Sequence, residues 1–267
     1  MIRDITIGQY YKADSVIHRL DPRVKLMGTL IFIISLFMGM NIWIYAVVTV
    51  ALAVVIKMSR IPLKFMVRGL KSIVILIIIS AVFNLFLTPG DVLIQIWKLT
   101  ITYQGLKMAI FMVVRLIYLI VGTSLMTLTT TPNNLTDGLE KGLGFLKVIK
   151  VPVHEIAMMM SIALRFIPIL IEETDKIMKA QMARGADFEN GSLIKRAKAM
   201  VPILVPLFVS AFRRANELAM AMEARCYHGS EGRTKMKPLK YEKRDRIAYI
   251  SMVLYFGVII IVKIIAA

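Results

Sequence analysis

The sequence predicts an all-α, polytopic membrane protein with about five transmembrane helices and a cytoplasmic helical region that contains two long helices. Three observations support this fold class. The 267 residues are 58% hydrophobic with a mean hydropathy of +0.71, whereas apolar residues make up about half of a soluble domain. Uncharged apolar runs long enough to cross a bilayer alternate with basic segments. The region between the fourth and last apolar runs shows no strand-like alternation, so we expect helices there.

The charge balance fits a membrane protein. A formal net charge of +17 would suggest nucleic acid as the partner of a soluble chain. In a membrane protein, lysines and arginines beside the spans set the topology and contact anionic lipid. No basic patch is interleaved with aromatic residues as in single-strand-binding proteins, so we expect a lipid bilayer and no nucleic acid. The single cysteine, Cys226, excludes an internal disulfide, and the polar segment Met1–Lys25 lacks the apolar core of a signal peptide.

The first apolar segment begins at a helix-start signal. Asp21 can accept hydrogen bonds from a first helical turn, and Pro22 suits the first helical position, where an N–H would have no partner. Leu26 to Ile56 carries no charge and is longer than the about 20 residues that one span needs. Gly39-Met-Asn41 is the candidate break between two passes. The basic N-terminus and a following basic run should both be cytoplasmic; the run comprises Lys57, Arg60, Lys64, Arg68 and Lys71.

Two further spans complete the N-terminal membrane domain, which we place at residues 1–131. Ile73 to Leu87 leads to a loop, from Thr88 to Gln104, that should lie outside the cell. Leu106 to Leu128 then returns inward and carries Arg115. An arginine at membrane depth is costly and marks function in many proteins, but near a helix end it can reach the headgroups instead. The sequence leaves both explanations of Arg115 open.

The next region, residues 132–244, is predicted to be a cytoplasmic coupling region. Thr131-Pro132 opens a short helix with one apolar stripe, formed by Leu135, Leu139, Leu143 and Leu146, which should face the membrane surface or a partner. The basic segment from Arg233 to Arg244 ends the region. A last span, Ile247 to Ile265, lies in a C-terminal transmembrane segment of residues 245–267, and five spans place the C-terminus outside.

Two similar segments stand out between Val153 and Gly229. Each passes from an apolar run with proline into a helical pattern rich in methionine and alanine, and each ends in Ala-Arg, at Arg184 and at Arg225. Aligned on these arginines, the copies also share Ala180 with Ala221 and Ala183 with Ala224. The helix from Pro152 to Arg184 would be about 50 Å long at 1.5 Å per residue, with a bend expected at Pro168.

The two arginines have an ordinary and a functional explanation. A cation in the last turn of a helix gains from the negative end of the helix dipole. Two such residues at the ends of matching segments, however, favour an interaction role, because guanidinium suits carboxylates and backbone carbonyls in the groove of a partner. We therefore expect a pair of docking tips.

Enzymatic readings are not supported by the sequence. His18, His154 and His228 lie in separate segments without metal-ligand spacing. Glu172 and Glu173 are adjacent, so on a helix they point about 100° apart. The chain has no phosphate-binding Gly-Lys-Ser/Thr loop, and hydrolysis of ATP would have to come from another chain. We expect a non-catalytic protein with no metal site.

Three motifs carry a family resemblance: Gly8-Gln-Tyr with Asp14-Ser-Val-Ile-His-Arg-Leu-Asp-Pro-Arg-Val-Lys-Leu26, then Gln181-Met-Ala-Arg-Gly185, and finally Met222-Glu-Ala-Arg225. With them the whole chain resembles the transmembrane T component of energy-coupling factor (ECF) transporters, ATP-binding-cassette importers for vitamins and other micronutrients in bacterial cell membranes. In that family the chain couples two cytoplasmic ATPase subunits, which bind ATP and Mg, to a separate membrane subunit, the S component, that binds the substrate. This chain would bind no cofactor itself.

The resemblance also implies residue roles. ATPase docking would fall to Ala183, Arg184, Gly185, Ala224, Arg225 and Cys226. The last of these replaces the family's glycine, which raises the question of how tight the second turn is. Flexible methionines repack well against differing partners, and we expect S-component contacts at Met158, Met159, Met178, Met182, Met220 and Met222, although ordinary core filling would explain any one of them. A permease that lines its own substrate path, or a membrane scaffold without a transport role, are the alternatives.

Overall fold

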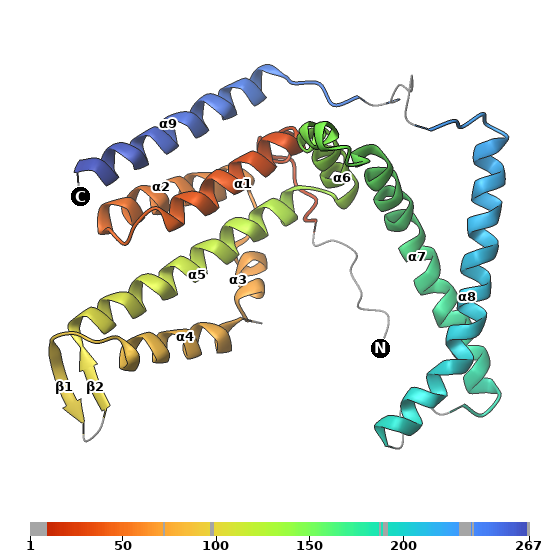
Figure 1. Cartoon of the computed structure of the whole chain (residues 1–267), viewed down its shortest axis with the longest axis horizontal. Coiled ribbons are helices and arrows are strands. Elements are labelled where there is room, and N and C mark those ends of the chain that lie inside the picture. Colours follow the sequence, from red (N-terminus) through yellow and green to blue (C-terminus); the bar gives the residue numbers. More distant parts are fainter. Residues whose placement is uncertain are drawn as a thin grey trace. The chain divides into compact units, whose positions relative to one another are not determined.

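The structure is a computed structural model that describes residues 10–71, 73–96, 99–186, 188, 192–229, 236 and 238–265. The chain divides into two compact units. One contains residues 8–141 and 239–267 and is called the membrane unit here. The other contains residues 142–238, together with 1–7, and is called the helix-pair unit. The expected all-α class is confirmed, because helices account for nearly all regular structure in the described ranges (Figure 1).

The long uncharged run of the membrane unit forms two helices, α1 (Pro22–Phe37) and α2 (Ile42–Ser59). The carboxylate of Asp21 accepts the N–H of Arg23 at 2.9 Å, and Pro22 occupies the first helical position, so α1 begins where the sequence predicts. The Asn41 side chain caps α2 by accepting the N–H of Trp43 at 3.1 Å. The predicted break at Gly39-Met-Asn41 is therefore confirmed.

The next elements are α3 (Leu63–Lys71), α4 (Val74–Leu87), β1 (Val92–Ile96) and β2 (Leu99–Thr102). The strands pair antiparallel, with Val92 opposite Thr102 and Ile96 opposite Leu99. The sequence analysis described this stretch only as a loop and missed the hairpin. Its signal is the high content of β-branched residues on both sides of a short connection.

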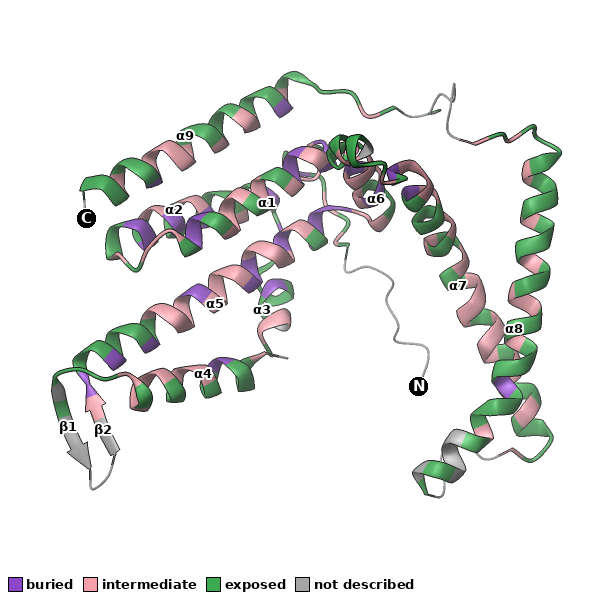
Figure 2. Cartoon of the chain, viewed as in Figure 1, coloured by how far each residue is buried: buried purple, intermediate pink, exposed green. Residues whose placement is uncertain are grey.

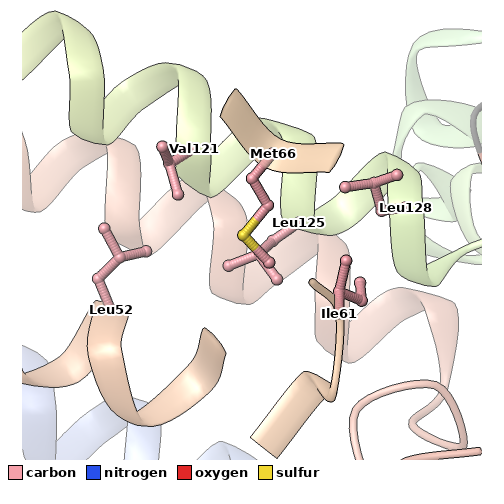
Figure 3. Packing of buried hydrophobic residues seen from close by; sticks show 6 residues of the cluster. All are labelled: Leu52, Ile61, Met66, Val121, Leu125 and Leu128. Carbon is pink, nitrogen blue, oxygen red and sulfur yellow. The ribbon is translucent and has the colours of Figure 1, made fainter. Parts of the chain in front are cut away.

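The longest helix of the membrane unit, α5 (Tyr103–Thr129), is packed against α1, α2, α3 and α4. One apolar core joins α5 to α2 and α3, and Figure 3 shows Met66 extending its thioether toward Leu125 between Leu52 and Leu128. Close approach to α1 requires Gly122, because a Cβ there would lie 2.3 Å from a carbon of the Phe32 ring. Its contacts with four neighbouring helices make α5 the centre of the membrane unit.

Two helices complete the membrane unit, α6 (Pro132–Gly142) and α9 (Lys243–Ile265). Gly138 of α6 lies against Pro22, where an added Cβ would come within 2.8 Å of the proline side chain. The helix α9 packs along α1 and α2, and Ile259 is fully buried with Leu36 and Ile44 in a second core. The N-terminal and C-terminal parts of the chain thus fold together in one unit.

The helix-pair unit contains the short 3₁₀ helix η1 (Gly144–Ile149) and two helices of 31 residues each, α7 (Val153–Ala183) and α8 (Leu193–Glu223). The first helix runs without interruption through Pro168, and the bend expected there stays a prediction. The second helix begins at Leu193. Within the described part of this unit the buried apolar residues are Val153, Ala157 and Ile203, and Figure 2 shows both helices mostly exposed or half-buried.

Four described helices are long and apolar enough to cross a membrane, namely α2, α5, α7 and α9, and α3 with α4 would make a fifth span if the pair is one span. The polytopic class is thereby supported. The helix α1 has 16 residues, shorter than the about 20 that a typical span needs. By composition, α7 could also cross a membrane. The mean hydropathy of its most apolar 18 residues is 1.6, compared with 2.1 to 2.3 for α2, α5 and α9. The cytoplasmic position of α7 remains a prediction.

Candidate docking site

The first candidate tip ends α7 with a tight hydrogen-bonded turn. The N–H of Gly185 donates to the carbonyl of Met182 at 2.9 Å, and the N–H of Ala186 donates to that of Gln181 at 3.0 Å. Gly185 has φ of 86°, the left-handed conformation that commonly ends a helix. Arg184 is therefore the last residue before the chain turns away.

The second candidate tip ends α8 with the same turn, bond for bond. The N–H of Cys226 donates to the carbonyl of Glu223 at 2.9 Å, and the N–H of Tyr227 donates to that of Met222 at 3.0 Å. Cys226 takes the left-handed role with φ of 54°. Its side chain therefore does not loosen the turn, which answers the question raised by the missing glycine. The cost is backbone strain of roughly 1–2 kcal/mol.

All six residues predicted to dock lie on the surface: Ala183, Arg184, Gly185, Ala224, Arg225 and Cys226 are exposed. In the described part of the chain neither guanidinium forms an ion pair. Each arginine follows an alanine, so the backbone beside it is open to a second protein. These two ends can offer a cation and a close-approach surface without first breaking an internal contact.

Three contacts show that α7 and α8 run antiparallel. Near the end of α7, the Gln181 amide donates to the carbonyl of Pro202 at 3.4 Å. That carbonyl has no helical partner, because the residue four positions on is Pro206, which lacks an N–H. Near the start of α7, the Tyr227 hydroxyl donates to the sulfur of Met158 at 3.1 Å.

The third contact lies between these two, where the Glu173 carboxylate receives hydrogen bonds from Ser210 and Arg214. As the position along α7 increases, the position of the partner on α8 decreases. The tip at Arg184 therefore lies toward the start of α8, whereas the tip at Arg225 lies toward the start of α7 (Figure 1). The two tips occupy opposite ends of one helix pair.

The methionines predicted to contact an S component divide into two sets. Met159, Met182 and Met220 are 49% to 61% exposed, and the remaining three, Met158, Met178 and Met222, are half-buried. The sequence analysis missed a larger exposed apolar face on α8, where Leu204, Phe208 and Phe212 are 57% to 66% exposed. Its signal was the apolar run around Pro202 and Pro206.

Part of the N-terminal motif that carries the family resemblance is buried in the membrane unit, namely Ser15, Asp21, Pro22, Val24 and Lys25. The ammonium of Lys25 donates to the carbonyl of Thr129 at 2.7 Å and to that of His18 at 3.1 Å. The backbone N–H of Asp21 donates to the carboxylate of Asp245 at 2.9 Å. We call these five residues the polar clasp, since they join the starts of α1 and α9 to the end of α5.

Neighbouring groups complete the bonding of the polar clasp. The second oxygen of Asp245 accepts the N–H of Glu242 at 2.8 Å, which is the side-chain-to-backbone half of a capping box for α9. Arg23 donates twice to Asp21, at 3.0 and 2.9 Å, and its guanidinium lies 3.8 Å from the Tyr241 ring centre. The sequence analysis did not name Asp245, although Glu242-Lys-Arg-Asp245 has the spacing of such a cap.

His18, a member of the polar clasp, also bonds to residues nearer the N-terminus. Its Nε2 lies 3.0 Å from the carbonyl of Tyr11, which can only accept, so Nε2 carries the proton. The other nitrogen, Nδ1, then accepts from the Ser15 hydroxyl at 2.7 Å. Burial is the main cause that lowers the pKa of His18 below its usual value of 6.5. His18 is therefore a neutral structural histidine at neutral pH.

Arg115 is buried inside the membrane unit, where its guanidinium lies near the end of α1 and the start of α2. Its side chain is buried, its Nε donates to the Tyr45 hydroxyl at 3.0 Å, and its guanidinium lies 5.1 Å from the Phe37 ring centre. These partners come from α1 and α2. Both explanations of Arg115, a functional arginine at membrane depth and one that reaches the headgroups, stay predictions.

The fold and these sites define a class of protein: a multi-pass membrane protein that presents two matched, exposed cationic helix ends. Among the described residues, no group of three or more histidine, cysteine, aspartate or glutamate side chains is placed to hold a metal ion. The model of the cobalt transport protein family CbiQ matches residues 13–236.

Curated relatives give a more specific result. A protein of Clostridium kluyveri is 57% identical over 93% of each chain, and one of Thermosediminibacter oceani is 56% identical over 94% of each. A protein of Bacillus subtilis is 47% identical over 95% of this chain and 96% of its own length. All three are energy-coupling factor transporter transmembrane proteins, EcfT. The chain belongs to this family and is a transmembrane component of an ECF transporter.

Proposed function

We propose that this chain couples two cytoplasmic ATP-binding-cassette ATPases to a separate S component that binds vitamins or other micronutrients in a bacterial cell membrane. The observation that carries the proposal is the pair of matched tips. Two exposed arginines end two antiparallel helices in identical turns, at opposite ends of one pair. Two similar helix ends would suit two similar binding grooves, one on each ATPase. ATP and Mg belong to the ATPases, and this chain binds no cofactor.

Docking at each tip follows from simple chemistry. The guanidinium can donate in pairs to a carboxylate or to carbonyl oxygens in a groove, and such charge-assisted bonds are among the strongest that side chains make. The small neighbours Ala183 and Ala224 let the wall of a groove come close to the backbone. ATP binding and hydrolysis would move the grooves, and Arg184 and Arg225 would carry that motion into α7 and α8.

Contact with the S component would use the apolar surface of the same helices. Monomeric soluble proteins rarely expose large contiguous apolar patches, so such a surface commonly marks a protein or membrane contact. On α8, Phe208 and Phe212 stack at 4.7 Å between ring centres and remain largely exposed. Met159 and Met220 add adaptable side chains. Rotation of the pair would then reorient the bound subunit.

The proposed topology places the N-terminus and the helix-pair unit in the cytoplasm. It rests on the positive-inside rule applied to the basic run between Lys57 and Lys71. Although α7 is apolar enough to span, its second half carries charged residues, including Glu172, Asp175 and Lys179. A span that included this half would place these charges in hydrocarbon.

The test is substitution of the tip arginines in the intact transporter. Arg184→Ala and Arg225→Ala should each reduce ATP-driven uptake and recovery of ATPases with the purified chain by at least fivefold, because each removes one paired donor. The double variant should lose nearly all uptake and still insert. The matched control is Arg213→Ala, an exposed arginine on α8 away from both tips. Normal uptake by the double variant would refute the proposal.

Two further readouts separate the alternatives. Cys226 is the only cysteine and is exposed, so an impermeant maleimide should label it in inside-out vesicles and leave it unlabelled in right-side-out vesicles. Labelling from the outside would place the second tip on the wrong side of the membrane. A photoreactive substrate that crosslinks to this chain instead of the small membrane subunit would support a permease that lines its own path.

A further inference from the structure

The contact between Glu173 and Arg214 has a feature that the docking role does not explain. Arg214 donates to one oxygen of Glu173 through Nη2 at 2.7 Å and through Nε at 3.2 Å, and the Ser210 hydroxyl donates to the other oxygen. Both carboxylate oxygens are therefore engaged by α8. The pair is only partly buried, with side chains 23% and 37% exposed.

The position of this contact relative to the tips is symmetric. Glu173 stands eleven residues before Arg184, and Arg214 stands eleven residues before Arg225. Eleven residues make about three helical turns, or roughly 16 Å, so each member lies on nearly the same side of its helix as its own tip arginine. The ion pair joins equivalent positions of the two matching segments.

The segments between the contact and the tips are built as stiff helix. Neither 173–184 nor 214–225 contains proline or glycine. The prolines of both helices, at Pro168, Pro202 and Pro206, come before the contact in their own helix, on the side opposite to the tip of that helix. Proline removes backbone hydrogen bonds and bends a helix. Within each helix, bending by proline is thus expected only before the contact, and an arm without proline or glycine extends from the contact to that helix's own tip.

The apolar side chains beside this contact, Ile169 and Ile177, are only half-buried. The buried apolar residues in the described part of the unit are at the start of α7 and at Ile203, not beside Glu173 or Arg214. A crossing without fully buried apolar residues can change its angle, and three charge-assisted hydrogen bonds to one carboxylate, from Arg214 and Ser210, constrain that angle. The contact is therefore placed to control how the arms move.

We propose that Glu173, Arg214 and Ser210 form a pivot that transmits displacement of one tip to the other, so that the two ATPases move the pair in concert. These residues act by positioning the arms and not by touching a partner. The inference rests on the proposed coupling function and adds a link between its two ends. It predicts that breaking the pivot uncouples ATP hydrolysis from uptake while both tips still dock.

The experiment uses the reconstituted transporter with measured uptake, ATP hydrolysis and ATPase recovery. Glu173→Gln keeps the size of the side chain and removes its charge, and Arg214→Ala removes the donor. Each should leave ATPase recovery within twofold of the parent and lower the amount of substrate moved per ATP at least fivefold. Glu172→Gln is the matched control and should behave as the parent, because this neighbouring carboxylate is exposed and the ion pair of Arg214 is made with Glu173.

Reversal of the charges tests the pair itself. The double variant Glu173→Arg with Arg214→Glu should recover at least half of the uptake per ATP, whereas each of its single changes should not. Unchanged uptake per ATP in Glu173→Gln and Arg214→Ala, with ATPases bound, would overturn the pivot and leave the docking proposal intact. No recovery in an assembled charge-reversed variant would also overturn it.

A second measurement covers variants that assemble poorly. With Cys226→Ala as background, Glu173→Cys with Arg214→Cys can be joined by a short bis-maleimide. The joined protein should regain uptake per ATP that the unjoined protein lacks, because the pivot is replaced by a covalent link. Equal uptake before and after joining would overturn the pivot. Failure of the docking proposal would differ, because Arg184→Ala and Arg225→Ala would then leave ATPase recovery unchanged.

Discussion

The membrane unit and the helix-pair unit use polar residues in opposite ways. Every buried polar or charged residue in the described ranges belongs to the membrane unit, from Ser15 to Asp245. In the described part of the helix-pair unit, the charged side chains are half-buried or exposed, and both tip arginines are exposed. The contrast in Figure 2 follows the same division, with buried positions concentrated in α1, α2 and α5.

This difference shows where each unit finds its partners. The membrane unit satisfies its polar groups internally, because an unpaired buried group is costly. The described part of the helix-pair unit exposes apolar and cationic side chains, and such a surface commonly marks a contact with another protein or with a membrane. A change in the polar clasp should therefore affect folding, whereas a change in the pivot or tips should mainly affect coupling.

The largest expected effect comes from removing the centre of the polar clasp. Asp245→Ala leaves the N–H groups of Asp21 and Glu242 without their acceptor in a site where Asp245 is 2% exposed. Each unsatisfied buried group costs about 1–3 kcal/mol, so we expect loss of about 2–4 kcal/mol of stability. Thermal unfolding of the purified protein in detergent measures it. Glu242→Gln, which changes an exposed side chain, should shift the midpoint little, and an equal shift would contradict the contrast.

An effect of intermediate size is expected when Cys226 is replaced by glycine, the residue at the equivalent position of the first tip. Cys226→Gly relieves the left-handed strain at φ of 54° and should stabilise the second turn by about 1 kcal/mol. The amide hydrogen of Tyr227, which donates to Met222 across the turn, should exchange more slowly with solvent as a result. Gly185→Ala in the first turn should have the opposite sign. Faster exchange at Tyr227 in Cys226→Gly would show that cysteine is the better residue there.

The smallest expected effect is a pH dependence of stability that arises from His18 in the membrane unit. Because the folded pKa of His18 is lowered, the unfolded chain binds a proton more readily. Stability should be complete above about pH 6.5 and decline as pH falls below it. The charge of Lys25 lowers the pKa of His18 further, whereas the charge of Asp14 raises it. The change of stability with pH should therefore be small.

Unfolding midpoints in detergent at pH 7.5 and 5.5 would measure this slope. His18→Gln should flatten it, because glutamine does not titrate, while His154 and His228 remain in both proteins as an internal control. An unchanged slope in His18→Gln would assign the pH dependence to another group. The lowered pKa of Asp21 acts only at more acidic pH, near or below about 4.

Local features of the fold could be predicted from sequence alone. The start of α1 at Asp21-Pro22, the break at Asn41 and the matched ends of α7 and α8 depend on residues adjacent in the chain. Capping, apolar runs and repeated motifs encode such features directly. The hairpin of β1 and β2 was missed because a short apolar run does not by itself separate strand from loop.

The composition of the chain determined its class, and the repeated Ala-Arg ends identified the candidate tips. Only the tertiary structure decided that Asp21 meets Asp245 across 224 positions, that Arg115 is held by Tyr45, and that Glu173 bonds to Arg214 midway between the tips. Such pairs arise when helices pack, and packing selects among many possible registers by the combined fit of whole surfaces. No local pattern in the sequence specifies which register is chosen.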